Sequence, residues 1–154
     1  VYPKLSGLGE KYLYRQLVLI KDKERNIAEM TGILDNMDDQ DLQDLAAYFN
    51  SKDMVVGQAD PDLVDQGAAL YRGGNMATGV PACAGCHSPQ GVGNEPAGYP
   101  ALGGQNAEYL VKQLQAYRDG ERDSGVNASI MMDVASKLTD AEIEAVSSYI
   151  SGLN

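Results

Sequence analysis

The sequence is poor in the residues that most catalytic and metal sites use. Its 154 residues include two cysteines and one histidine, and all three lie between positions 83 and 87. A structural zinc site takes four protein ligands, and the Cys and His residues of this chain cannot supply a fourth. Since the one histidine belongs to the cysteine motif, none is left for a catalytic triad. The candidate chemistry is therefore concentrated at one point of the chain.

Long apolar runs and basic residues are also scarce. No segment approaches the roughly 18 apolar residues of a membrane-spanning helix, and the most apolar one, residues 12–20, is interrupted by Arg15 and Gln16. The first residues do not resemble a signal peptide, so an exported protein would be represented here by its processed form. Twelve Lys and Arg against 22 Asp and Glu give a net charge of −10, which disfavours nucleic acid and anionic membranes. This acidity suits either a basic partner surface or a merely solvated face.

The chain contains an internal duplication. "YPKLSGLGEKYLYRQL" at residues 2–17 matches "YPALGGQNAEYLVKQL" at 99–114, an offset of 97, and residues 37–51 match 138–152 at an offset of 101. A repeat of this length predicts two homologous domains. We expect an incomplete first domain at 1–52, a linker at 53–59 and a complete second domain at 60–154. The offset places the counterpart of Cys83 before Val1, so we expect the first domain to lack its front.

Every regular element is predicted to be helical. Leu13, Leu17 and Ile20 recur at helical spacing, and no strand pattern exceeds four residues. Thr139 followed by Glu142 is a capping box, and Asp38 with Asp41 repeats it in the first copy. The sequence therefore predicts an all-α fold of two tandem helical domains.

One close helix crossing is predicted in the second copy. A helix is expected to start near Asp60 or Pro61 and to run to Gly73. We expect it to cross the helix that follows Thr139, with Gly67 permitting close approach near Tyr149.

A longer loop is also predicted in the second copy. The charged stretch "ERDSGVN" at residues 121–127 is typical of a solvated loop, and it precedes Met131. The difference between the two offsets means that the second copy has gained four residues in this region.

The motif "PACAGCH" admits several chemistries. A thioredoxin-like CxxC needs a βαβ context that is missing here, and a disulfide between Cys83 and Cys86 would be strained and would gain little entropy. Covalent haem attachment uses all three residues, because two thiols add to the porphyrin vinyl groups and the adjacent His87 imidazole binds the iron. We therefore predict haem c at this motif.

Methionine is the natural candidate for the second axial position of such a haem. Met131 lies seven residues before Leu138, just as Met30 lies seven before Met37, whereas Met132 corresponds to a threonine. Met131 is thus the predicted distal ligand, at a loop position, with packing as the alternative role. A haem with two protein ligands has no vacant position for a substrate, which favours one-electron transfer over catalysis.

The other ring nitrogen of His87 should donate to a carbonyl group. Pro100 has no N–H with which to join a helix and is the candidate acceptor, or it only ends the loop before Leu102 enters the core. We place Pro100, and Tyr99 before it, against the cofactor.

With these motifs assembled, the whole chain resembles the dihaem cytochrome c4 family, in stretches such as "AEMTGILDNMDDQDLQDLAAYF", "PACAGCH" and "YPALGGQNAEYLVKQL". The resemblance implies a periplasmic electron carrier, free or membrane-associated, with two class I cytochrome c domains and one haem per domain. It implies an upstream electron donor and a membrane-bound terminal oxidase as partners. Carried over by position, Cys83 and Cys86 hold the haem, His87 and Met131 bind its iron, and Met30 is the distal ligand of the first haem. The departure from the family pattern is the missing first CxxCH.

Two rival functions follow from the same residues. Haem subunits of sulfide-oxidising flavocytochromes resemble the same family, so the chain could serve a larger redox enzyme. A peroxidase or gas sensor would require a loosened distal methionine.

Overall fold

The computed structural model describes residues 1–154, and all its regular elements are helices. In chain order they are α1 (Glu10–Lys21), the 3-10 helix η1 (Ala28–Met30), α2 (Asp39–Asn50), α3 (Val64–Gly73), α4 (Ala84–His87), α5 (Ala107–Arg118), α6 (Ala128–Ser136) and α7 (Asp140–Ser151). Extended pairing is limited to two isolated bridges. The predicted all-α fold is confirmed. None of the helices has the length and apolarity that a membrane crossing requires.

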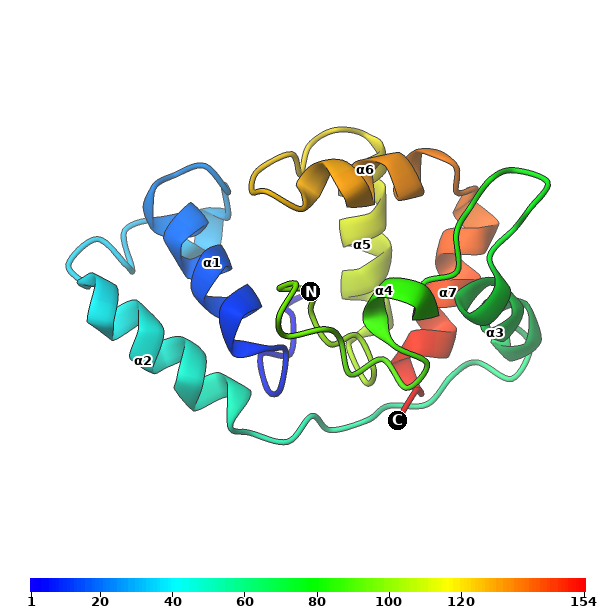
Figure 1. Cartoon of the computed structure of the whole chain (residues 1–154), viewed down its shortest axis with the longest axis horizontal. Coiled ribbons are helices and arrows are strands. Elements are labelled where there is room, and N and C mark those ends of the chain that lie inside the picture. Colours follow the sequence, from blue (N-terminus) through cyan, green and yellow to red (C-terminus); the bar gives the residue numbers. More distant parts are fainter.

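The helices form two groups along the long axis of the molecule (Figure 1). α1 packs on α2 at one end, whereas α3, α5, α6 and α7 form the larger group at the other end. The buried apolar residues divide in the same way, because Leu8, Leu13 and Ala46 form a small cluster and the larger cluster comes entirely from residues 70–153. Each group therefore has a core of its own.

The segment between α2 and α3 lies against α7 and is held there by hydrogen bonds. The Gly57 amide donates to the Ser151 carbonyl at 2.9 Å, and the Asp60 amide donates to the Ser148 hydroxyl at 2.8 Å. Figure 1 shows this segment running along one edge of the molecule from the first group to the second. The connection between the groups is thus anchored on the second one.

The predicted helix starts agree with the structure at two of three places. Asp38 and Thr139 both cap their helices with complete capping boxes, through Asp41 and Glu142. The helix expected from Asp60 starts only at Val64. The Asp60 side chain and carbonyl instead accept bonds from the amides of residues 62 and 63, which close a turn before the helix.

The crossing of α3 and α7 at Gly67 is confirmed. A Cβ atom at Gly67 would lie 2.6 Å from the Tyr149 Cβ and would also clash with the Ala145 carbonyl oxygen. A residue with any side chain would force these backbones apart. The glycine therefore sets how closely the two helices pack, and Tyr71 from α3 and Val146 from α7 are almost fully buried beside it.

The duplication extends to individual backbone hydrogen bonds. The Gly7 amide donates to the Phe49 carbonyl at 3.1 Å in the first group. At the equivalent position of the second group, the Gly104 amide donates to the Ile150 carbonyl at 3.0 Å. Between the groups, the Lys4 amide donates to the Gln105 side chain at 2.8 Å. In the reciprocal contact the Ala101 amide donates to the Leu8 carbonyl at 3.0 Å. Lys4 and Ala101 are repeat equivalents, as are Leu8 and Gln105, so the two groups meet around a pseudo-twofold axis.

Gly67→Leu is expected to weaken the second group strongly. The leucine side chain must displace backbone atoms of α7, an overpacking that costs about 3 kcal/mol. Denaturant unfolding and the yield of haem-loaded protein measure the effect. Gly73→Leu is the matched control, because a Cβ atom at Gly73 on the same helix would meet no neighbouring atom within 4 Å. Equal stability of the two variants would contradict a close crossing at Gly67.

Candidate functional site

An apolar cavity lies between the helices of the second group and reaches the junction with the first. It is lined by 34 residues, 22 of them hydrophobic, including Leu8 and Leu19 from the first group. The structure brings six predicted site residues together on this cavity: Cys83, Cys86, His87, Tyr99, Pro100 and Met131. Met30 lies instead on a second cavity in the first group, lined also by Arg25 and Ile27.

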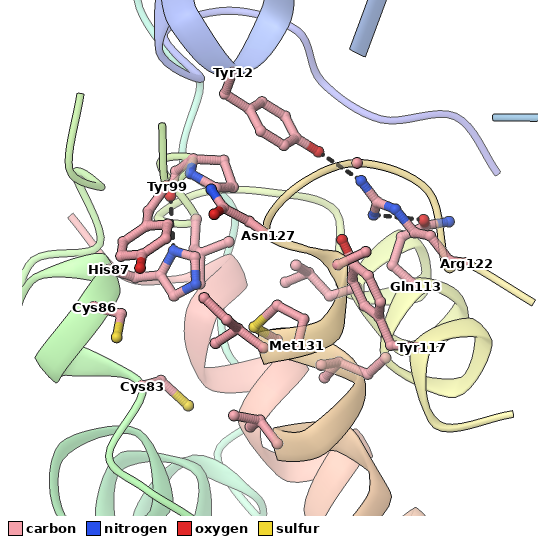
Figure 2. Close-up of a pocket in the computed structure, with 18 of the residues that line it drawn as sticks. Tyr12, Cys83, Cys86, His87, Tyr99, Gln113, Tyr117, Arg122, Asn127 and Met131 are labelled. Atoms are coloured by element: carbon pink, nitrogen blue, oxygen red, sulfur yellow. Dashed lines mark hydrogen bonds between the residues drawn. The ribbon is translucent and has the colours of Figure 1, made fainter. Parts of the chain in front are cut away.

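His87 ends the short helix α4 and is buried, with 7% of its surface exposed. Its Nδ1 lies 2.9 Å from the Pro100 carbonyl oxygen, which can only accept, so Nδ1 carries the proton. The Nε2 lone pair is then free on the side of the ring facing the cavity, as Figure 2 shows. Burial lowers the pKa of His87 more than the bond to Pro100 raises it. The imidazole is therefore neutral at pH 7, the form that binds metal ions.

Two further contacts fix the loop that carries His87. The fully buried Tyr71 of α3 donates its hydroxyl proton to the Ser88 carbonyl at 2.7 Å. The Gly93 amide donates to the His87 carbonyl at 2.9 Å. Ser88 adopts φ of 70°, a left-handed conformation that ends α4 directly after the histidine. The imidazole is thereby held by α3 as well as by the Pro100 segment.

Tyr99 lies beside this imidazole. The ring centroids of Tyr99 and His87 are 6.2 Å apart, and the backbone of Tyr99 pairs with Asn94 in an isolated bridge. The bridge holds the chain in place just before Pro100, so it supports the position of the acceptor carbonyl.

The two cysteine thiols are free and are not bonded to each other. Burial raises the pKa of the Cys83 thiol to about 11. Redox-active CxxC thiols have a lowered pKa, because the thiolate is their reactive form. Cys83 therefore lacks the environment of a thioredoxin-like motif, and both sulfur atoms lie at the wall of an apolar cavity (Figure 2).

Met131 lies on α6, which differs from the loop expected at this position. Residues 128–136 form a helix packed against α5, whereas the equivalent Met30 ends a single 3-10 turn. The second copy has four additional residues between its repeats, which give room for this longer element. Figure 2 shows the Met131 side chain extending from α6 into the cavity toward His87. The neighbouring Met132 does not line the cavity.

These residues fit haem c. The cavity wall is mostly hydrophobic, as a porphyrin ring requires, and two thiols lie at one side of it. The neutral, buried His87 follows Cys86 directly in the sequence, and its Nδ1 is already hydrogen-bonded to the Pro100 carbonyl. Cys83 and Cys86 would hold the porphyrin and His87 its iron, and the bound group supplies a reversible one-electron change at iron.

Sequence reasoning missed one part of this cavity. The sequence predicts a solvated loop at residues 121–127, but Arg122 is only half-exposed and lines the cavity. Its guanidinium donates to Gln113 at 2.7 Å and to the Tyr12 hydroxyl of the first group at 2.9 Å. The repeat could have indicated that Arg122 is not merely solvated, because Arg25 occupies the equivalent position in the first copy, 97 residues earlier.

Comparison with known proteins gives one consistent assignment. The cytochrome c family matches residues 64–154. Cytochrome c4 from Pseudomonas aeruginosa is 56% identical over 99% of this chain and 76% of its own length. The crystal structure of reduced recombinant cytochrome c4 from Pseudomonas stutzeri superimposes with a TM-score of 0.95 at 52% identity, covering 99% of this chain and 85% of that one.

A relative with a different name is also similar. A thiosulfate dehydrogenase electron acceptor from Thiomonas intermedia is 38% identical over 97% of this chain and 70% of its own length. Its name describes a protein that accepts electrons.

The tandem cytochrome fold, the cavity with its Cys, Cys and His residues, and these matches agree, and the chain belongs to the cytochrome c4 family of electron-transfer proteins, with a covalently attached haem c.

Proposed function

We propose that His87 and Met131 are the two axial ligands of the haem attached at Cys83 and Cys86, and that the protein carries single electrons. The observation that supports this is their position on one apolar cavity, with the Met131 side chain directed toward the free face of the His87 ring. Two protein ligands leave no position for oxygen, peroxide or an organic substrate. The residues therefore suit a carrier rather than a catalyst.

In this proposal Pro100 and Tyr99 act on the proximal side. The Pro100 carbonyl keeps the proton on Nδ1 of His87, which directs the Nε2 lone pair into the cavity and strengthens it as a donor. Thioether sulfur at the distal position and an apolar wall both favour the ferrous state. The chain thus sets a raised reduction potential and keeps its ligands in place in both oxidation states.

We assign Met30 the corresponding distal role for a haem of the first domain. It occupies the repeat position of Met131 and borders a cavity of its own. Residues 1–52 contain no cysteine or histidine, so the assignment concerns this one ligand only. We place the domain boundaries at 1–52 and 60–154, with residues 53–59 as the linker.

The carrier is proposed to work in the periplasm, free or at a membrane surface, between an upstream donor and a membrane-bound terminal oxidase. Its family membership supports a role in electron transfer between partners, and its net charge of −10 favours basic contact surfaces on them. A second role, as a haem subunit or acceptor of a larger redox enzyme such as a flavocytochrome, is supported by the relative named as a dehydrogenase electron acceptor. Purification with a flavin-bearing or dehydrogenase chain would favour that role over the free carrier.

Met131→Ala is expected to open the iron to added ligands. The reduced variant should bind carbon monoxide and should lose the methionine-to-iron charge-transfer absorption at the red end of the visible spectrum. Met132→Ala is the matched control, because it removes the same side chain one residue away and outside the cavity lining. The assignment fails if the absorption survives in Met131→Ala, or if it disappears only in Met132→Ala.

Replacing Cys83 and Cys86 together by serine is expected to abolish covalent attachment. The intact mass should lose the increment of one haem, and acidified organic solvent should then extract any pigment that remains. A pyridine haemochrome assay counts the haem in parallel. Haem that stays covalently bound to the double variant would rule out attachment at this motif.

A further inference from the structure

The hydrogen bond between His87 and Pro100 is the first of a series that crosses into the other helical group. Nδ1 of His87 donates to the Pro100 carbonyl at 2.9 Å, a bond that Figure 2 shows as a dashed line at the His87 ring. The N–H of the same peptide group belongs to Ala101, and it donates to the Leu8 carbonyl of the first group at 3.0 Å. One peptide group therefore joins the imidazole to the first group.

The series continues through a second peptide group to the side chain of Asn50. The Leu8 carbonyl shares its peptide group with the Gly9 N–H, which donates to Oδ1 of Asn50 at 2.9 Å. Asn50 is the last residue of α2. Three hydrogen bonds and two peptide groups thus connect the His87 ring, donor to acceptor, with an amide side chain of the first group. We refer to them as the hydrogen-bond chain.

The first-group end of this hydrogen-bond chain is held firmly. The Gly7 amide donates to the Phe49 carbonyl at 3.1 Å, so the loop is bound to the last turn of α2 on both sides of Leu8. Gly9 adopts φ of 104°, a conformation that favours glycine. Leu8 and His87 are buried, with 6% and 7% of their surfaces exposed. Burial at these two points limits the access of water to the bonds between them.

Hydrogen bonds in series strengthen one another when they are shielded from water. A peptide group whose oxygen accepts a bond becomes a better donor at its N–H, and the reverse also holds, by roughly 10–30% per bond. The acceptor at Asn50 can therefore change how strongly the Pro100 carbonyl attracts the Nδ1 proton of His87. A stronger bond at Nδ1 makes the ring a stronger electron donor at its other nitrogen.

The duplicated fold does not repeat this hydrogen-bond chain. At the equivalent position Lys4 takes the place of Ala101, and its amide donates to Oε1 of the Gln105 side chain at 2.8 Å instead of to a backbone carbonyl. The same Oε1 also accepts the Asn106 amide at 2.9 Å, so the series stops at this one atom. The extension to Asn50 therefore distinguishes the site of the second group from its counterpart in the first.

We propose that Asn50 of the first group sets the reduction potential of the haem attached at Cys83 and Cys86, as a positioning residue that acts through the hydrogen-bond chain. A stronger acceptor at position 50 draws the Nδ1 proton of His87 toward Pro100, which gives the ring more anionic character. A more anionic ligand stabilises the ferric state and lowers the potential, and loss of the acceptor has the opposite effect. This inference rests on the proposed role of His87 as an axial ligand and not on the identity of the sixth ligand.

Asn50→Asp and Asn50→Ala in the full-length haem protein test the proposal in opposite directions. The carboxylate that Asn50→Asp introduces is the stronger acceptor, because hydrogen bonds to an ionised group are roughly twice as strong as neutral ones. Spectroelectrochemical titration should show a ferrous-to-ferric ratio about threefold lower at a fixed electrode potential, or about 28 mV where tenfold is 59 mV for a one-electron couple. Asn50→Ala should raise the ratio by about 1.5-fold.

NMR of the reduced, diamagnetic protein follows the polarisation bond by bond. In Asn50→Asp the amide protons of Gly9 and Ala101 should move downfield. The Nδ1 proton of His87 should move in the same direction by a smaller amount, and Asn50→Ala should reverse all three shifts. The Gly93 amide donates to the His87 carbonyl at 2.9 Å outside the hydrogen-bond chain, and its proton should not move.

Ser51→Asp is the matched control for charge alone. It adds a carboxylate one residue along the chain, at an exposed side chain that bonds to the Tyr48 carbonyl and not to Gly9. The potential should shift less than half as far as in Asn50→Asp, and the Nδ1 proton of His87 should stay in place. The methionine-to-iron absorption should persist in all three variants, which separates this effect from loss of the ligand in Met131→Ala.

An unchanged potential in Asn50→Asp would overturn the proposal. Equal shifts in Asn50→Asp and Ser51→Asp would do the same, because they would assign the effect to charge acting through space. A potential that falls in both Asn50 variants contradicts polarisation, which requires opposite signs, and proton shifts without any change of potential contradict the tuning role. Failure of the proposed ligation would show instead in the unaltered protein, where the ring protons of His87 would lack the haem ring-current shift.

Discussion

The close contact of α3 with α7 is the constraint on which the haem site depends. Gly67 lets the two helices touch at backbone distance, and the buried Tyr71 of α3 then reaches the loop behind His87. From α7, Val146 and Ile150 form part of the cavity wall. One helix pair therefore supplies both the support of the imidazole and the apolar surface facing it. A small shift of either helix would change the position of the His87 imidazole and the shape of the cavity together.

The duplicated sequence explains why the two domains meet as they do. Related surfaces face each other, so each contact occurs twice with the roles exchanged, as in the pairs of Lys4 with Gln105 and Leu8 with Ala101. A cavity placed near this axis, as the Met131 cavity is, receives residues from both copies, including Tyr12 of the first. The junction is thus part of the cofactor environment and is more than a connection between two carriers.

Much of the fold and of the candidate site could be predicted from the sequence, because the informative features are local or repeated. The capping boxes at Asp38 and Thr139 and the crossing at Gly67 follow from short-range patterns, and the structure confirms them. The helix around Met131 was missed, since the residues that precede it are typical of a polar loop. Arg122 was missed for a related reason: an arginine in a charged segment is usually solvated, and its burial is decided by tyrosine and glutamine side chains about 110 and 9 residues away.

The charge distribution has opposite signs at the surface and at the junction. The surface is acidic, with a net charge of −10 for the whole chain, while the junction holds the guanidiniums of Arg25 and Arg122. These two groups donate to tyrosine and glutamine side chains and form no ion pair with a carboxylate. Surface charges are screened by water and salt, but the partly buried pair is screened far less. The pair therefore acts strongly on the groups around it, and it lowers the pKa of the Tyr12 hydroxyl although burial alone would raise that pKa. The acidity of the surface and the positive charge at the junction therefore depend on different residues and can change independently.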